Sequence, residues 1–92
     1  MVTVVKRKGH SEAFDEKKVY GSVYAACASA FYTELTCERV ASEMTRRIKS
    51  KLAKKKQVNS HEIRKLVTEV LKKKDKQLAF FYEHYLPNLK KL

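Results

Sequence analysis

The sequence predicts a small α+β domain in which a four-helix cluster packs against a small three-stranded sheet. A β-branched segment at residues 2–7 and a second segment at 10–14 flank Lys8-Gly9, which is typical of a hairpin. The stretches that follow have apolar residues at helical spacing. A short segment at 57–59 supplies the third strand, which has only the hairpin to pair with. No linker or repeat divides the chain, so we expect a single domain over residues 1–92.

Each predicted helix begins at a residue that can cap it. Asp15 precedes the first helix, Thr36 the second and Ser60 the third, and each side chain can accept a bond from a free first-turn amide. Asp75 starts the fourth helix, which continues to Leu86. The first helix carries an apolar stripe formed by Val19, Val23, Ala26, Cys27, Ala30 and Phe31.

The charge balance predicts anionic partners. The chain has 21 Lys and Arg against 10 Asp and Glu, a net charge of +11. Nucleotides, nucleic acids and acidic membranes all fit such a charge, and a solvated lysine coat is the structural alternative. The segment from Arg46 to Lys56 contains basic residues and no acid, and Lys72 to Lys74 form a second run.

Other chemistry finds little support in the sequence. No apolar stretch is long enough to span a membrane or to form a signal peptide, which favours a cytoplasmic protein without membrane contact. Cys27 and Cys37 are therefore expected as reduced thiols, although their disulfide stays an alternative. The scattered cysteines and histidines lack the spacing of a zinc site.

The opening of the chain carries a specific motif. Val4-Val5-Lys6-Arg7-Lys8-Gly9 is followed by Glu12-Ala13-Phe14-Asp15 and then by Lys18-Val19. This order resembles the opening of the ATP-cone family, which has a hydrophobic residue, Lys-Arg, any residue and Gly, then Glu-x-Phe-Asp and a Lys in the first helix. Val58-Asn59-Ser60-x-x-Ile63 and the aromatic close from Asp75 to Tyr85 resemble later parts of the family. The resemblance covers nearly the whole chain.

The resemblance implies a function. ATP-cones are adenine-nucleotide-binding regulatory modules of ribonucleotide reductases and of a repressor of reductase genes, and ATP or dATP changes how the attached protein assembles or acts. We therefore expect a stand-alone domain that binds ATP or dATP as effector. It would act as an allosteric sensor for a partner, such as a ribonucleotide reductase or transcription regulator, or for its own homo-oligomeric state. We do not expect an enzyme.

The predicted nucleotide-binding residues are Val4, Lys6, Arg7, Glu12, Phe14, Lys18, Val19, Ser60 and Arg64. Because the chain has no glycine-rich phosphate loop, phosphates would need cationic side chains and a helix N-terminus. Lys6 and Arg7 end the first strand, and Lys18 lies in the first turn of the first helix. Ser60 and Arg64 share one face of the third predicted helix. By resemblance, Glu12 would accept a hydrogen bond from ribose or base, and the apolar members would form walls for adenine.

Each of these residues has a structural alternative. Lys6 and Arg7 can be the solvent face of an edge hairpin, and Glu12 a cross-strand ion-pair partner. Ser60 can cap its helix without any ligand, and Arg64 can pair with a nearby acid. The apolar members are expected in the core under either interpretation.

Two other functions were weighed against nucleotide sensing. A nucleic-acid-binding or transcription-regulatory module is the alternative, because lysine runs give salt-dependent, sequence-tolerant phosphate binding. Catalysis would need metal-holding carboxylates beside the phosphates, and Glu12, Asp15 and Glu16 are the only cluster. Mg²⁺ can accompany a bound triphosphate, but the sequence has no dedicated metal site.

Overall fold

The α+β class is confirmed by the computed structural model of the chain, which describes residues 3–5 and 11–84. Within this part, short strands form a sheet and four helices form the body of the domain. The elements in chain order are β1 (Thr3–Val5), β2 (Ser11–Ala13), α1 (Glu16–Ser29), α2 (Glu34–Leu52), β3 (Gln57–Asn59), α3 (Ser60–Lys74) and α4 (Lys76–His84).

The sheet has the order β2-β1-β3, with β1 in the centre. β1 runs antiparallel to β2, with Val4 opposite Glu12, and parallel to β3, with Val4 opposite Val58 and Val5 opposite Asn59. The described strands have three residues each. Residues 2, 6, 7 and 10 of the predicted segments 2–7 and 10–14 lie outside the described residues, and Phe14 follows the end of β2. The predicted turn at Lys8-Gly9 lies outside the described residues.

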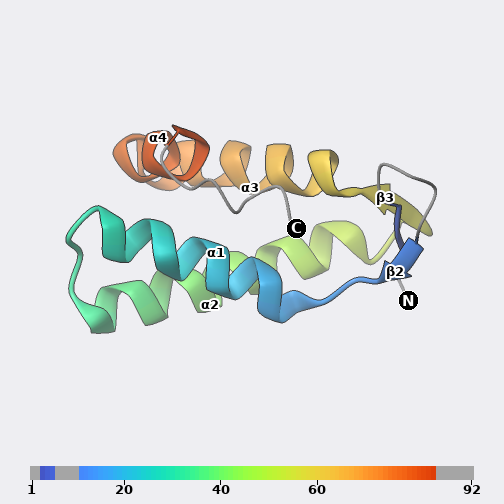
Figure 1. The fold of residues 1–92 in the computed structure, drawn as a ribbon, viewed down its shortest axis with the longest axis horizontal. Coiled ribbons are helices and arrows are strands. Elements are labelled where there is room, and N and C mark those ends of the chain that lie inside the picture. The colour runs from blue at the N-terminus through green and yellow to red at the C-terminus, as the bar shows by residue number, and fades with distance from the viewer. Residues whose placement is uncertain (1–2, 6–10, 85–92) are drawn as a thin grey trace.

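The helices form two layers (Figure 1). α1 and α2 pack side by side as one layer, and α3 and α4 cover them as the other. The sheet lies at one end of the molecule, together with the start of α1, the end of α2 and the start of α3. The α1–α2 turn and the α3–α4 junction lie at the opposite end.

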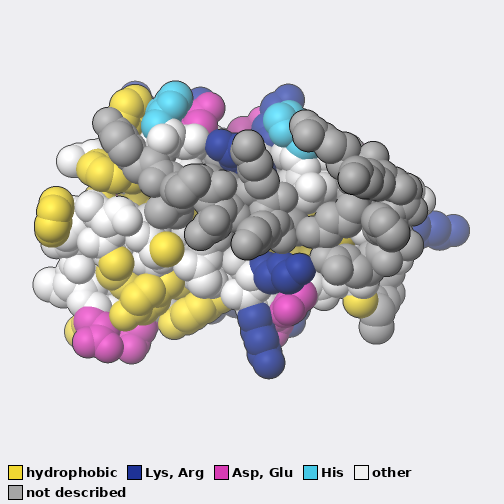
Figure 2. Space-filling model, in the orientation of Figure 1, with side chains coloured by type: hydrophobic (Ala, Val, Ile, Leu, Met, Phe, Trp, Pro, Cys, Tyr) yellow, Lys and Arg dark blue, Asp and Glu magenta, His cyan; other side chains and the backbone are white. Residues whose placement is uncertain are grey.

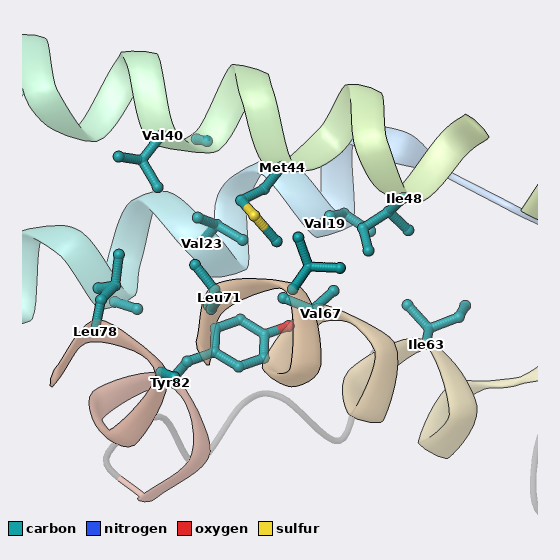
Figure 3. Close-up of a cluster of buried hydrophobic side chains, with 14 of the residues drawn as sticks. Val19, Val23, Val40, Met44, Ile48, Ile63, Val67, Leu71, Leu78 and Tyr82 are labelled. Atoms are coloured by element: carbon teal, nitrogen blue, oxygen red, sulfur yellow. The ribbon is translucent and has the colours of Figure 1, made fainter. Parts of the chain in front are cut away.

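The core lies between the two helix layers (Figure 3). Met44 and Ile48 of α2 face Val67 and Leu71 of α3 there, and all four side chains are fully buried. Tyr82 of α4 is also fully buried, and its hydroxyl lies 3.1 Å from Ser22 Oγ of α1. The aromatic close of the chain therefore anchors α4 to α1.

Two of the predicted helix starts are confirmed and two are wrong. The Asp15 side chain accepts a bond from the Lys17 amide at 2.9 Å and caps α1. The Asp75 side chain accepts from the Leu78 amide in the first turn of α4. Thr36, however, lies inside α2, because Thr33 is the cap and its hydroxyl accepts from the Thr36 amide.

The cap predicted at Ser60 is also wrong. Ser60 is the first residue of α3, and the cap is Asn59. The Asn59 side chain accepts from the Glu62 amide at 2.7 Å and donates to the Glu62 carboxylate at 2.9 Å. This reciprocal arrangement satisfies one free amide and orders both side chains, so the helix starts one residue earlier than expected.

The end of α1 brings a third correction, at Phe31. The predicted apolar stripe included this residue, but α1 ends at Ser29, and Phe31 follows the C-cap Ala30 with a φ of 64°. The left-handed backbone turns the chain toward α2 and leaves the Phe31 side chain 94% exposed. Tyr32 turns inward instead, and its hydroxyl donates to the Asp75 carboxylate.

Both cysteines are free thiols buried in the core. The pKa of Cys27 is raised to about 12, mainly by burial and to a smaller extent by the nearby Cys37. Cys27 therefore stays a protonated, unreactive thiol at neutral pH, as its place on the apolar stripe predicts.

Candidate functional site

A small pocket lies at the sheet end of the molecule, between the sheet and the first turns of α1 and α3. The residues that line it are Val4, Ala13, Phe14, Asp15, Lys18, Val19 and Ile63. Four of them are predicted nucleotide-binding residues: Val4, Phe14, Lys18 and Val19. Segments far apart in the sequence therefore meet where the motif predicted a site.

The pocket has an apolar floor and a charged rim. Val4, Val19 and Ile63 are 2%, 1% and 1% exposed, and they join the main core. Phe14 is half-buried and packs against the same core. Lys18 and Asp15 are both exposed, so one positive and one negative charge lie on the solvent side of the pocket.

The local backbone positions these residues. Phe14 leaves β2 and Asp15 caps α1, so the first turn of α1 starts directly at the pocket. Lys18 and Val19 lie in that turn, one toward solvent and the other into the core. The Lys18 amide donates to the Asp15 carbonyl at 3.1 Å and so begins the helical ladder. The side chains are therefore held by rigid elements.

The space among these side chains is narrow in this structure and does not hold an aromatic ring. Phe14 belongs to the short connection between β2 and α1, where fewer backbone bonds oppose a movement than within a helix. Phe14 is therefore the wall of the pocket that a local rearrangement would displace most easily.

The sheet register places the start of α3 beside the carboxyl end of β1. Val5 lies opposite Asn59, and Ser60 follows as the first residue of α3. The predicted phosphate ligands Lys6 and Arg7 directly follow Val5 but lie outside the described residues. The backbone of Glu12 lies opposite Val4 in the sheet, and its side chain is also outside the description.

Ser60 and Arg64 do not line the pocket. Ser60 is half-buried at the start of α3. The Arg64 guanidinium reaches away from the sheet, and its Nη2 donates to the Glu83 carbonyl in the last turn of α4 at 2.9 Å. The Arg64 charge also lies near Tyr82 and opposes the effect of burial, which raises the pKa of Tyr82 to about 12. In this structure Arg64 connects α3 to α4.

Three residues that line the pocket are absent from the predicted binding residues. Asp15 was expected only as a cap and Ile63 only as a core residue. Ala13 was expected in the second strand without a role at the site. The motif itself contains Ala13 and Asp15 between Glu12 and Lys18, so adjacency to predicted ligands was the available signal.

The described residues lack other site chemistry. They contain no group of three or more His, Cys, Asp or Glu side chains that could hold a metal ion. Across the same residues, no helix has both the length and the apolar character needed to cross a membrane.

The fold and pocket define a small α+β domain whose candidate site combines apolar walls with one positive and one negative side chain at its rim. The ATP cone domain family matches the chain over residues 2–86. The chain therefore belongs to the ATP-cone family of nucleotide-binding regulatory domains. A regulatory rather than catalytic family agrees with the expectation that the chain is not an enzyme.

One curated relative is similar to the chain. It is the transcriptional repressor NrdR of Carboxydothermus hydrogenoformans, which is 35% identical over 72 residues. The match covers 78% of this chain but 46% of the repressor, so the chain spans less than half of that protein. No solved structure shows significant similarity to the chain.

Proposed function

We propose that this domain binds ATP or dATP as an effector and acts as an allosteric sensor for a partner protein or for its own oligomeric state. The observation that carries this proposal is the pocket at the sheet end, which gathers Val4, Phe14, Lys18 and Val19 from separate elements. Family membership and the similarity to a transcriptional repressor support it.

In the proposed complex, adenine lies against the apolar walls of the pocket, and the phosphates point toward the start of α3. Lys18 supplies one positive charge at the rim, and Lys6 and Arg7 supply the others. The first-turn amides of α3 add a partial positive charge beside the end of β1. Glu12 accepts a hydrogen bond from ribose or base, and Mg²⁺ accompanies the phosphates without a dedicated protein site.

Ser60 fits the phosphate end of this site through its position at the start of α3. Arg64 would contact the nucleotide only after leaving the Glu83 carbonyl. A bound triphosphate would compete for the Arg64 guanidinium because it offers charged acceptors in place of a neutral carbonyl. This exchange would free the end of α4 and offers a route from nucleotide binding to a changed surface.

Calorimetric titration of ATP and dATP at physiological salt, with GTP as control, tests the proposal. Saturable binding that prefers adenine over guanine is the expected result. Weak and equal binding of all triphosphates that disappears as salt rises would reduce the effect to charge attraction and overturn the proposal.

Matched variants test the site assignment. Lys18→Ala should weaken ATP binding by roughly tenfold, as expected for one lost contact of about 1.4 kcal/mol. Lys17→Ala is the control, because it removes the same charge from a neighbouring exposed lysine that does not line the pocket. Lys6→Ala and Arg7→Ala should also lose binding without unfolding. Full affinity in both of them would show that the site lies elsewhere.

Nucleic-acid binding is a second candidate. From Arg46 to Lys56 the chain has seven basic residues and no acid, and Lys49 and Lys55 of this run form ion pairs with Glu16 and Glu62. The similar repressor is by name a transcriptional regulator. Retardation of duplex DNA that falls steeply with salt is expected under this proposal. Lack of retardation even at low salt would remove it.

A further inference from the structure

The line along which α2 and α3 meet carries charged side chains at both of its ends and between them. The two helices run in opposite directions (Figure 1). At one end, the Lys74 amine of α3 lies 3.1 Å from the Glu43 carboxylate of α2. At the other end, the amine of Lys55, just after α2, lies 3.6 Å from the Glu62 carboxylate of α3. We call this surface the α2–α3 seam, and its members are Glu43, Arg47, Lys51, Lys55, Glu62 and Lys74.

The two ion pairs also determine which residues lie opposite each other in the middle of the seam. The same number of residues separates the pairs on both sides, so Arg47 of α2 lies level with Val70 of α3, and Lys51 lies level with Leu66. Val70 is buried and Leu66 is half-buried, so α3 places no negative charge opposite these two cations. Among the described residues, Arg47 pairs only with Glu43 of its own helix, and Lys51 has no acidic partner.

The acids of the seam do not balance its positive charge. Glu43 is shared by Lys74 and Arg47, since Arg47 Nη2 lies 3.4 Å from the same carboxylate. The hydrogen bond from Lys74 lowers the pKa of Glu43, and the nearby arginines lower it further, so Glu43 stays charged at neutral pH. Even so, two carboxylates face four cations. The side chains of Arg47, Lys55 and Lys74 are 54%, 51% and 37% exposed, which leaves them accessible to an anionic ligand.

The surroundings of the seam indicate which anion it fits. A membrane surface would call for apolar side chains that insert among lipids, and a single-stranded nucleic acid for aromatic platforms that stack on bases. Among the described residues, the exposed large hydrophobic side chains are Phe31, Leu35 and Phe80, and none belongs to the seam. Figure 2 shows apolar side chains gathered mainly toward the end opposite the sheet. The seam is thus a polar row of cations on rigid helices, which suits the phosphates of a duplex.

We propose that the α2–α3 seam binds the phosphate backbone of duplex DNA independently of base sequence. Each of its four cations contacts a phosphate. From Glu62 to Lys74 the seam extends about 18 Å along α3, which corresponds to roughly five base pairs. A phosphate at Arg47 or Lys74 shares these cations with Glu43, so Glu43 weakens the contact. This inference rests on the nucleic-acid candidate function and adds the surface that makes the contact.

Fluorescence anisotropy of a short labelled DNA duplex, titrated with the full chain over a series of salt concentrations, tests the seam. Four phosphate contacts predict that the logarithm of the affinity falls with the logarithm of salt with a slope of about −3.6. The double variant Arg47→Gln, Lys51→Gln should weaken binding at low salt by at least about tenfold and make the slope shallower by about 1.8. The matched control is Lys17→Gln, Lys72→Gln, which removes the same charge from exposed lysines outside the seam and should keep the wild-type slope.

A second pair of variants changes the charge in the opposite direction. Glu43→Gln releases Arg47 and Lys74 from their shared carboxylate and should strengthen DNA binding by roughly threefold, in keeping with the small energy of a surface ion pair. Glu38→Gln changes the net charge equally at an exposed position of α2 outside the seam and should have a smaller effect.

The outcomes separate this inference from the proposals on which it rests. If the seam variant and its control weakened binding alike, overall charge would hold the DNA, and the seam would be overturned while the nucleic-acid candidate remained. A wild-type chain that binds no duplex even at low salt would remove both. Sedimentation with phosphatidylserine vesicles in the absence of DNA binding would overturn the inference in favour of a membrane surface. Calorimetric ATP binding is measured separately, because the pocket uses other residues.

Discussion

Phe31 occupies a backbone conformation that glycine adopts more readily. Its φ of 64° follows the end of α1, at the position where helices usually end with glycine. A bulky residue in the left-handed region costs about 1–2 kcal/mol. The side chain is 94% exposed and so gains little from burial within the chain. The left-handed backbone at Phe31 is therefore a cost that burial of its side chain does not offset.

Phe31→Gly should raise the free energy of unfolding of the monomer by about 0.5–1 kcal/mol, because backbone relief exceeds the extra entropy of glycine in the unfolded chain. Urea denaturation measures this change. Phe31→Ala is the control, because it removes the ring but keeps the left-handed cost. If both variants were equally stable, backbone strain at this position would be negligible.

At the scale of elements, Asp75 joins two connections that are distant in sequence. One carboxylate oxygen accepts from the Leu78 amide at 3.1 Å and caps α4, and the other accepts from the Tyr32 hydroxyl after the α1–α2 turn. The Asp75 amide also donates to the Leu71 carbonyl at the end of α3. A single side chain thus ties both helix pairs together at the end opposite the sheet.

Asp75→Ala should lower the free energy of unfolding by about 2–3 kcal/mol. The lost helix cap accounts for about 1 kcal/mol, and the lost hydrogen bond from Tyr32 to the charged carboxylate accounts for about 1.5 kcal/mol or more. Asp75→Asn should lose roughly half as much, since asparagine also caps helices. Thermal and urea unfolding of the two variants measure the difference. A loss below about 0.5 kcal/mol in Asp75→Ala would mean that solvent replaces both bonds.

The same junction predicts loss of stability at alkaline pH. The hydrogen bond to Asp75, with burial, raises the pKa of Tyr32 to about 12, and burial raises the pKa of Tyr82 to about 12. An unfolded tyrosine ionises near 10. Because the folded state holds these protons more tightly, their contribution is complete below pH 10 and is lost as pH rises toward 12.

Urea titrations across that pH range should show this decline, and it should be smaller in Tyr82→Phe, which cannot ionise at that position. If the wild type and Tyr82→Phe lost stability in parallel, ionisation of Tyr82 would make no contribution to the decline. Among the described side chains, the Tyr82 hydroxyl has one hydrogen bond, to Ser22 Oγ. Replacement of Tyr82 by phenylalanine removes this bond and should itself lower the free energy of unfolding by about 1 kcal/mol.

The presence of the helices was predictable from local sequence patterns, but several of their first and last residues were not. Apolar spacing placed all four helices, and Asp15 and Asp75 were predictable because each is a strong cap before an apolar run. Asn59 and Ser60 are both good caps, and the reciprocal bond between Asn59 and Glu62 decided between them. The exposure of Phe31 depended on where α1 ended, which periodicity alone does not determine.

The candidate site follows the same distinction. Val4, Phe14, Lys18 and Val19 meet in one pocket because they lie close to the junction of the sheet with α1, so short-range geometry gathers them. Arg64 was assigned by its spacing from Ser60 on one helix face. Its guanidinium instead finds a carbonyl on α4, 19 residues later in the chain. Such a tertiary partner leaves no signal in local spacing.

At the scale of the whole molecule, the net charge of +11 acts against folding. Ion pairs join Glu16, Glu43 and Glu62 to lysines or an arginine, but each pair lies on the surface and is worth about 0–1 kcal/mol. The excess positive charge has no counterpart within the chain, and the compact state concentrates it. A bound anionic ligand would therefore relieve this repulsion in addition to the contacts that it makes.

Sodium chloride should accordingly raise the melting temperature of the isolated chain. At physiological ionic strength, salt largely screens exposed charges that lie more than about 8 Å apart, and repulsive pairs outnumber attractive ones in this chain. A Lys54→Gln, Lys56→Gln variant removes two exposed charges from the basic run. It should be more stable than wild type at low salt and respond less to added salt. Scanning calorimetry of both proteins over a salt series measures the effect. A wild-type melting temperature that fell with salt would mean that the surface ion pairs outweigh the repulsion, and the basic run would then have to be explained by its contacts within the fold rather than by an anionic partner.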